Sequence, residues 1–408
     1  MSTAASSSLP QQTSPTSPTG GPVRVPPGKV WLNADEPDDE YPLFCVSAIP
    51  PKKPGTVRIW VDGCFDMLHF GHANALRQAR RLGTELFVGS HSDEEVMRFK
   101  GPPIMHAEER YEALRGCKWV DYVIENYPYC TRLKDMERLE IDYVAHGDDI
   151  SVGLDGRNSY QEIIDAGKFK VVKRTEGIST TDLVGRMLLC TKNHMLQSMD
   201  EMQLENELIE QSPTTHYLTT SRKIVQFSNN SSPKPGDRIV YVDGSFDLFH
   251  IGHMRVLEKA REFGDYLIVG VYEDKVVNDH KGKNYPIMNL NERVLGVLSC
   301  RYVDEVVMGV PFDVTKELIE SLGIDVVVGG KFTDLVLDGP ASTCYEVPKA
   351  MNIYQEVDSG TTLSTDSLVD RVVENRLAFL KRQAEKRRKD KKSAESKPEE
   401  YRNVKEVN

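Results

Sequence analysis

The sequence predicts an α/β protein made of two tandem Rossmann-like domains, each with a doubly wound parallel sheet. Short β-rich runs alternate with helical patterns along most of the chain, and a long segment of the first half returns in the second half. The chain has 408 residues, which is too long for one ordinary domain, and 39% of them are hydrophobic. That proportion is enough to fill two cores of this size.

The first domain is expected to contain five strands connected by helices. The expected strands are 57–61, 85–89, 122–124, 143–145 and 170–172, and the expected helices are 73–82, 107–114, 133–139 and 183–189. Strands that alternate with helices at this spacing form a parallel sheet with crossover helices.

The second domain is predicted from an internal repeat. The sequence VDGCFDMLHFGH at 61–72 returns as VDGSFDLFHIGH at 242–253, and IDYV at 141–144 returns as IDVV at 324–327. A duplication with so long a period indicates two domains of one fold. We therefore expect a disordered tail over 1–55, a catalytic domain over 56–190, a linker over 191–236, a second and degenerate domain over 237–376, and a charged segment over 377–408.

The two ends of the chain differ in composition. Residues 1–55 are rich in Ser, Thr, Pro and Gly, which bury too little apolar surface to offset the entropy of ordering. Near the other end, Val373, Leu377, Leu380 and Ala384 have helical spacing and precede the basic run 386–392. We expect a last helix that packs on the second domain and continues into a solvated tail. The alternative is a basic helix in weak peripheral contact with anionic lipid, for example at the endoplasmic reticulum surface.

Composition excludes several classes of protein. The formal charge of −11 argues against a nucleic-acid binder. The seven cysteines form no CxxC pair, which favours reduced thiols in a cytoplasmic protein over a disulfide framework or a zinc site. No apolar run approaches the roughly 18 residues that span a bilayer, and no signal peptide is visible. A homodimer is left open.

The motif His69-Phe70-Gly71-His72 lies where a strand ends and a helix begins. Backbone N–H groups and the helix dipole favour phosphate at such a place, and two imidazoles can direct donors at the same oxygens. Gly71 is expected to let the ligand approach closely. Ordinary buried histidines are the alternative, but recurrence within the longer frame DGxFDxxHxGH argues against it.

A second motif runs from Arg174 to Thr181 and reads RTEGISTT. It follows a strand and precedes a helix, so Ser179 and Thr180 are expected to cap that helix and to offer donors to a triphosphate. Arg174 adds a fork-shaped cation. The alternative is a plain loop with a helix cap.

Together the two motifs resemble the cytidylyltransferase family of the HxGH nucleotidyltransferase superfamily, over residues 57–190 in full and 238–375 in part. The resemblance implies transfer of CMP from CTP with Mg²⁺ on the triphosphate, and the sequence itself shows no dedicated set of metal ligands. The tandem arrangement, with RTEGISTTDLVGR at 174–186, is similar to the members whose acceptor is phosphoethanolamine. The resemblance also supplies roles for site residues. The implied catalytic residues are His69, His72, Lys100, Arg174, Ser179 and Thr180, and the implied nucleotide-binding residues are Cys64, Phe65, His69, His72, Asp93, Thr175, Gly177 and Thr181.

The acceptor is expected at His146-Gly147-Asp148-Asp149, which follows the fourth strand at the carboxyl edge of the sheet. Carboxylates suit a primary ammonium, and His146 suits the acceptor phosphate. The resemblance implies that Tyr160 lies near the amine, where it could add a cation–π contact. The resemblance also places Lys100 between the two reactants, although an isolated lysine in a loop is usually solvated. Turn residues that bond the backbone are the alternative for the aspartates.

The second copy keeps part of these motifs. The residues expected to bind nucleotide there are Ser245, Phe246, His250, His253, Lys281, Ser364 and Thr365. However, RTEG at 174–177 becomes VDSG at 357–360, and HGDD at 146–149 becomes GGKF at 329–332. We expect this copy to bind cytidine nucleotide without catalysis. Phosphocholine, glycerol 3-phosphate or another phosphorylated alcohol remains an alternative acceptor for the first copy, and a catalytically silent nucleotide sensor is an alternative for the whole chain.

Overall fold

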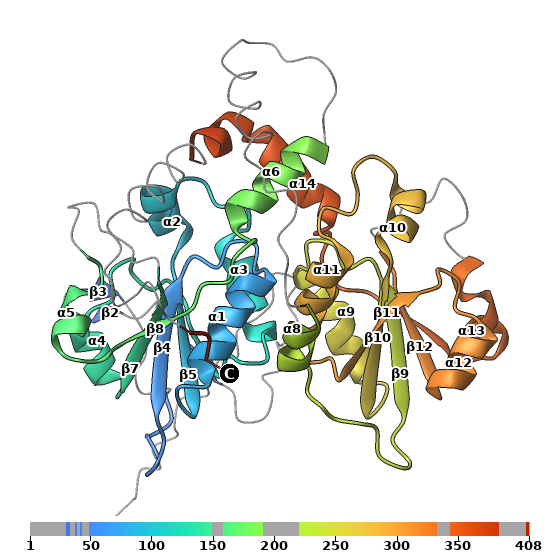
Figure 1. The fold of residues 1–408 in the computed structure, drawn as a ribbon, viewed down its shortest axis with the longest axis horizontal. Helices are drawn as coiled ribbons and strands as arrows, with labels where there is room; N and C mark the ends of the chain where they lie inside the picture. Colours follow the sequence, from blue (N-terminus) through green and yellow to red (C-terminus); the bar gives the residue numbers. More distant parts are fainter. Residues whose placement is uncertain are drawn as a thin grey trace, which may run out of the picture.

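The computed structural model describes residues 30–32, 37–38, 41–42, 49–148, 158–190, 220–332, 343–382 and 405–407. They form two parallel sheets that stand side by side, with the helices of both halves between them and around them (Figure 1). The α/β class with two tandem Rossmann-like domains is confirmed.

The first sheet has the strand order β1-β6-β5-β4-β7-β8, and every neighbouring pair is parallel. Its strands are β1 (Val30–Leu32), β4 (Arg58–Gly63), β5 (Glu85–Ser90), β6 (Tyr122–Ile124), β7 (Tyr143–Gly147) and β8 (Phe169–Val172). Its helices are α1 (Phe70–Arg80), α2 (Asp93–Lys100), α3 (Ala107–Gly116), α4 (Leu133–Arg138), α5 (Gln161–Asp165) and α6 (Thr180–Cys190). The chain order reverses direction between β4 and β7, and open α/β sheets bind ligands at such a switch point.

The second sheet repeats this order as β11-β10-β9-β12-β13. Its strands are β9 (Ile239–Gly244), β10 (Tyr266–Tyr272), β11 (Glu305–Val310), β12 (Val326–Gly330) and β13 (Tyr354–Val357). Its helices are α9 (Ile251–Arg261), α10 (Asp274–Lys281), α11 (Leu290–Leu298), α12 (Lys316–Leu322), α13 (Glu346–Ala350) and α14 (Thr365–Glu374). The short helix α8 (Thr220–Phe227) lies in the segment predicted as a linker. A two-stranded antiparallel pair, β2 (Pro37–Asp38) and β3 (Tyr41–Pro42), precedes the first sheet.

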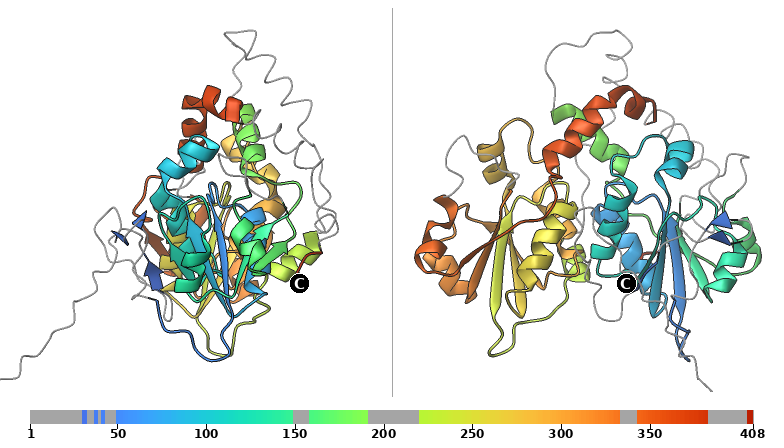
Figure 2. Two further views of the ribbon diagram at one scale, coloured as in Figure 1. Left: turned by 90° about the vertical axis from the view of Figure 1, so that its left-hand side faces the viewer. Right: turned by 180° about the vertical axis from the view of Figure 1, so that it is seen from behind.

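The two domains share one hydrophobic core. Phe70 and Leu183 of the first half belong to the same buried cluster as Phe249 and Leu295 of the second half. Backbone contacts reinforce the seam, because Lys118 N donates to Ser299 O at 3.0 Å and Arg301 N donates to Gly116 O at 2.9 Å. The view from behind in Figure 2 shows the two sheets on either side of this seam. The halves are therefore packed against each other much as two subunits of a dimer would be.

The structure differs from the sequence predictions in three places. Strand β1 lies inside the segment expected to be disordered and pairs with β6. The free edge of a sheet can order a short run of residues whose own β propensity is weak. Helices α2 and α5 were not predicted. Residues 376–382 are helical, with Leu380 buried and Leu377 exposed. Arg382 in this segment donates a hydrogen bond to Pro102 O of the first domain. The last helix therefore also contacts the first domain, and its expected packing on the second domain stays a prediction; Ala384 and 386–392 lie outside the described residues.

Candidate active site

The histidine motif is built on the turn between β4 and α1. Phe65 and Met67 both adopt left-handed backbone conformations, with φ of 50° and 52°, so the chain reverses within a few residues. His69 is the N-cap of α1, and its Nδ1 accepts hydrogen bonds from Gly71 N at 3.1 Å and His72 N at 3.4 Å. An imidazole whose Nδ1 accepts carries its proton on Nε2 when neutral. The cap therefore fixes His69 as an Nε2–H donor.

The second histidine of the motif lies directly against the first. The rings of His69 and His72 stack with centroids 3.9 Å apart and an interplanar angle of 21°. The buried ring of Phe65 contacts His72 edge-on at 5.7 Å. Stacked and supported in this way, the two imidazoles are brought together as the sequence predicted, and both are held in one orientation.

Gly71 joins the two motifs. A Cβ at this position would lie 2.7 Å from Cγ2 of Ile178 and 2.9 Å from Cε1 of His69. Ile178 belongs to the RTEGIST segment and is buried. The absence of a side chain at Gly71 is therefore required for packing between the two motifs, and its expected role in ligand approach stays a prediction.

The hydroxyl groups of the second motif bond within the protein. Ser179 Oγ donates to Asp182 Oδ2 at 2.7 Å and accepts from Asp182 N at 3.2 Å, which caps the start of α6. Thr180 Oγ1 donates to Asp66 O at 2.9 Å, and Thr175 Oγ1 accepts from Asn74 Nδ2 at 2.9 Å. These bonds attach the RTEGIST segment to the histidine turn and to α1. The backbone N–H groups at the start of α6 are further potential donors to an anion, in addition to the guanidinium of Arg174.

The other members of this segment are placed around the same turn. Arg174, Gly177 and Thr181 are half-buried, and Gly177 has a φ of 83°, which favours glycine. Asn74, which holds the segment through Thr175, was not identified from the sequence, because a buried asparagine on a helix carries no motif signal.

Lys100 is the last residue of α2, where Gly101 ends the helix with a φ of 92°. It was expected in a loop. Its side chain is exposed, and Nζ lies 5.6 Å from the ring centre of Tyr129, which also stacks on Phe99 at 4.0 Å. Burial raises the pKa of the Cys64 thiol, and the positive charge of Lys100 acts in the opposite direction. The lysine is therefore close enough to the histidine turn to influence a group on it.

Arg110 is a buried residue that sequence reasoning did not assign to the site. Its guanidinium donates to the carbonyl oxygens of Cys64 and His91, both at 2.8 Å, and to Oδ1 of Asp93 at 2.8 Å. Asp93 Oδ2 also accepts from Ala107 N. Asp93, expected to border the nucleotide, is thus engaged by Arg110 and the start of α3, and its carboxylate helps to anchor the turn that carries Cys64.

The expected acceptor residues lie at the end of β7, the neighbour of β4 in the sheet: His146 and Gly147 are its last two residues, and Asp148 follows it. His146 and Asp148 are half-buried at this edge, and Asp149 lies outside the described residues. Tyr160 is buried, its ring lies 4.8 Å from that of His146, and its hydroxyl donates to Asp62 Oδ2 at 3.1 Å. The buried ring supports His146, and the expected cation–π contact of Tyr160 with the acceptor amine stays a prediction.

The second copy repeats the scaffold of the first. His250 Nδ1 accepts from Gly252 N at 3.1 Å, and its ring stacks on His253 at 3.9 Å. Thr365 Oγ1 donates to Asp247 O at 3.0 Å, as Thr180 does to Asp66. Ser364 caps α14 by accepting from a backbone N–H. Ser245 and Phe246 are buried, and Phe246 has a φ of 51°.

The charged groups of the second copy are engaged differently. Lys281, which corresponds to Lys100, lies 3.1 Å from Asp366, and its side chain is only 9% exposed. Asp366 stands where the first copy has Thr181. Lys331 lies 3.3 Å from Asp358, so the two charges introduced by the changed motifs face each other. Lys281 is therefore largely buried in an ion pair, whereas Lys100 is exposed.

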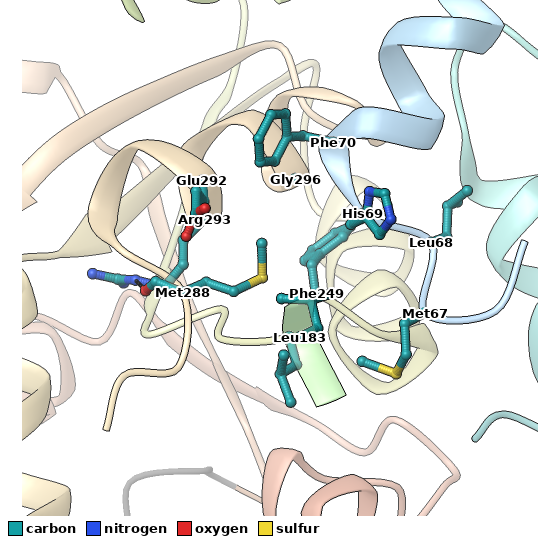
Figure 3. Close-up of a pocket in the computed structure, with 11 residues that line it drawn as sticks. Met67, Leu68, His69, Phe70, Leu183, Phe249, Met288, Glu292, Arg293 and Gly296 are labelled. Carbon is teal, nitrogen blue, oxygen red and sulfur yellow. Dashed lines mark hydrogen bonds between the residues drawn. The ribbon is translucent and has the colours of Figure 1, made fainter. Parts of the chain in front are cut away.

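A small, mostly apolar pocket lies between the two histidine turns (Figure 3). Residues from both halves line it, namely Met67, Leu68, His69, Phe70, Leu183, Leu248, Phe249, Met288, Glu292, Arg293 and Gly296. Residues of the second domain therefore lie next to His69 across this pocket.

Comparison with known proteins agrees with this geometry. The model of the cytidylyltransferase-like family matches residues 60–211 and 241–355. The chain belongs to the cytidylyltransferase family. Curated ethanolamine-phosphate cytidylyltransferases from Dictyostelium discoideum and Mus musculus are 53% and 44% identical to it, over 85% and 84% of this chain and 98% and 93% of theirs.

A cytidylyltransferase of another name matches only part of the chain. Choline-phosphate cytidylyltransferase 2 of Arabidopsis thaliana is 42% identical over 37% of this chain and 51% of its own length. The chain thus resembles the ethanolamine-phosphate enzymes through both of its halves. In the described residues, no helix is long and apolar enough to cross a membrane.

Proposed function

We propose that this cytidylyltransferase transfers CMP from CTP to phosphoethanolamine, giving CDP-ethanolamine and pyrophosphate for phosphatidylethanolamine synthesis. The observation that carries the proposal is the junction of the two motifs at Gly71. There the fixed Nε2–H of His69 and the start of α6 converge on one turn, which can hold a nucleotide triphosphate.

The proposed reaction is an in-line attack of the acceptor phosphate oxygen on the α-phosphorus, with pyrophosphate as the leaving group. The protein contributes positioning and charge stabilisation, as in phosphoryl transfer generally. His69 and His72 would donate to the α-phosphate, and Lys100 would bridge the reactants from the end of α2. Arg174 and the N–H groups at the start of α6 would hold the departing pyrophosphate. The loss of one such donor costs about 2.7–4 kcal/mol of transition-state stabilisation.

Mg²⁺ is proposed as the companion of CTP. Among the residues that the structure describes, no group of three or more His, Cys, Asp or Glu side chains could hold a metal ion. The donor set therefore suits an ion carried by the phosphates, with the protein supplying cationic and N–H partners. Such an ion would neutralise negative charge on the triphosphate.

The acceptor is proposed to lie at the carboxyl end of β7, beside His146 and Asp148. A carboxylate there complements a primary ammonium, and the imidazole suits the acceptor phosphate. Phosphocholine would present three methyl groups in place of N–H donors, so it would gain less from Asp148. The names of the relatives that match both halves support the same choice.

The second domain is proposed as a non-catalytic half that keeps a cytidine-nucleotide cradle at His250 and His253. Its lysine is paired with Asp366, and it has no counterpart of the carboxylates after β7. Turnover of CTP by the second site alone is therefore not expected. Residual CTP binding in a His69→Ala, His72→Ala double variant, measured by calorimetry, would locate nucleotide in the second half.

The decisive experiment is to incubate the full chain with CTP, Mg²⁺ and either phosphoethanolamine or phosphocholine. Formation of CDP-ethanolamine at the higher kcat/KM is the expected result. A preference for phosphocholine would overturn the proposed acceptor. Binding of CTP without any release of pyrophosphate would leave the nucleotide-sensor alternative in its place.

A further inference from the structure

We propose that the second half of the chain positions the lysine loop of the first site through Arg371 and Arg382. The lysine loop is defined here as residues 100–106, which comprise the last residue of α2 and the connection from α2 to α3. The inference rests on the proposed function, because the loop begins with Lys100. It assigns the second domain a task that is independent of any nucleotide bound there.

Arg371 lies on α14 and crosses to the first domain. Its two terminal nitrogens donate to both carboxylate oxygens of Glu109, at 2.6 and 2.8 Å, and Nη1 also donates to Ile104 O at 3.1 Å. On the other side of the same residue, Asp66 accepts from Ile104 N at 3.0 Å and from Met105 N at 2.9 Å. The loop is therefore held by its own domain through its N–H groups and by the opposite half through its carbonyl.

Arg382 contacts the loop two residues before Ile104, at Pro102. It lies in the helical residues 376–382, and its Nη1 donates to Pro102 O at 2.7 Å. The same guanidinium lies 3.7 Å from Asp66 Oδ2, and its aliphatic stem lies over Gly101. Two arginines thus contact the loop on both sides of the Pro102–Pro103 segment, within a few residues of Lys100.

The chemistry requires arginine at position 371. The side chains of Arg371 and Glu109 are 28% and 14% exposed, so the pair is partly removed from water. A planar guanidinium can meet both carboxylate oxygens and a carbonyl at once. A lysine ammonium is a point charge on a flexible stem and cannot reproduce this set of bonds.

The same arrangement occurs with the two halves exchanged, because an arginine of the first half contacts the second half. Arg186 on α6 donates to both oxygens of Glu292 at 2.7 and 3.0 Å and to Ile287 O at 3.3 Å. Asp247 accepts from the N–H groups of Ile287 and Met288. Figure 1 shows α6 and α14 lying side by side above the two domains. Each half therefore contributes an arginine that contacts the lysine loop of the other half. The Arg186 contacts can serve as the control for the Arg371 contacts.

The test compares full-length Arg371→Met with full-length Arg186→Met. Both variants break one bidentate pair and one carbonyl contact of the same seam, so similar losses of thermal stability are expected. Arg371→Met is expected to lower kcat by about tenfold or more with little change in KM for CTP. Arg186→Met, which releases only the lysine loop of the second domain, is expected to keep kcat within about twofold.

Hydrogen exchange gives a readout that does not depend on activity. Arg371→Met should speed exchange of the Ile104 and Met105 amides, and Arg186→Met should do so for Ile287 and Met288. Equal losses of kcat in the two variants, or unchanged exchange at Ile104 in Arg371→Met, would overturn the proposal. If the wild-type chain made no CDP-ethanolamine, the proposed function would fail, while the exchange result would still decide whether Arg371 holds the loop.

Discussion

Replacing Gly71 by Ala tests whether the contact between the two motifs sets the rate. The new Cβ would lie 2.7 Å from Ile178 Cγ2, whereas carbon atoms in contact are usually about 3.5–4.0 Å apart. One of the two segments must therefore move by about 1 Å. Overpacking of this kind costs about 1–3 kcal/mol of stability, and a 1 Å misplacement of catalytic groups can cost about 10²-fold in rate.

The assay is the initial rate of pyrophosphate release with CTP and phosphoethanolamine, measured beside the thermal midpoint. Gly252→Ala is the matched control. Its Cβ would lie 2.9 Å from the ring of His250 and 3.0 Å from Leu363 O, so it creates a comparable clash at the second site. We expect a loss of about 10²-fold for Gly71→Ala and a much smaller loss for Gly252→Ala. A Gly71→Ala rate within about threefold of wild type would refute the reasoning.

Three further predictions concern single side chains. His72→Ala should lower kcat by about 10²-fold or more at unchanged thermal stability, and near-normal turnover would contradict its role. Tyr160→Phe should cost about 1–3 kcal/mol of unfolding free energy in urea, because Asp62 loses a donor, and an unchanged unfolding free energy would contradict a stabilising role of this hydrogen bond. Burial raises the pKa of Asp243 to about 6, so the folded state binds its proton more tightly than the unfolded chain. Proton binding by Asp243 contributes fully to the free energy of unfolding below about pH 4. About 3 kcal/mol of this contribution is lost as the pH rises through 6. Asp243→Asn should therefore gain stability relative to wild type between pH 4 and 7 in urea titrations, and a constant difference would show that Asp243 does not titrate there.

The elements that the sequence predicted are those with a strong apolar pattern. Strand β6 begins and ends where expected, and β4, β5, β7 and β8 differ by one or two residues at their ends. Helix α2 was missed because its eight residues, DEEVMRFK, bury only Val96 and show no apolar stripe. Strand β1 could not be predicted, because its partner β6 lies about 90 residues away and supplies the ordering through the sheet edge.

The sequence predicted which motifs build the candidate site, but it did not predict the hydrogen bonds that connect them. His69, His72 and Ser179 could be assigned to the start of a helix because residue types at such turns follow local rules. The bond from Thr180 to Asp66 spans 114 positions and no local rule reveals it. Arg110 was overlooked as a member of the site because a fully buried arginine reads as an ordinary helix residue until its partners are known.

The duplication separates the groups that build the fold from those that handle substrate. The bonds present in both halves are structural: a histidine Nδ1 that caps a helix, a threonine that donates to a turn carbonyl, and an arginine that crosses the seam. The groups that differ are those proposed to contact the substrates, and in the second half Lys281 is paired with an acid that the first half lacks. His250 is needed for its cap in either case, so its presence is weak support for nucleotide binding. Lys281 is more informative, because its ion pair with Asp366 distinguishes it from Lys100 and supports the proposal that this half binds nucleotide without catalysis.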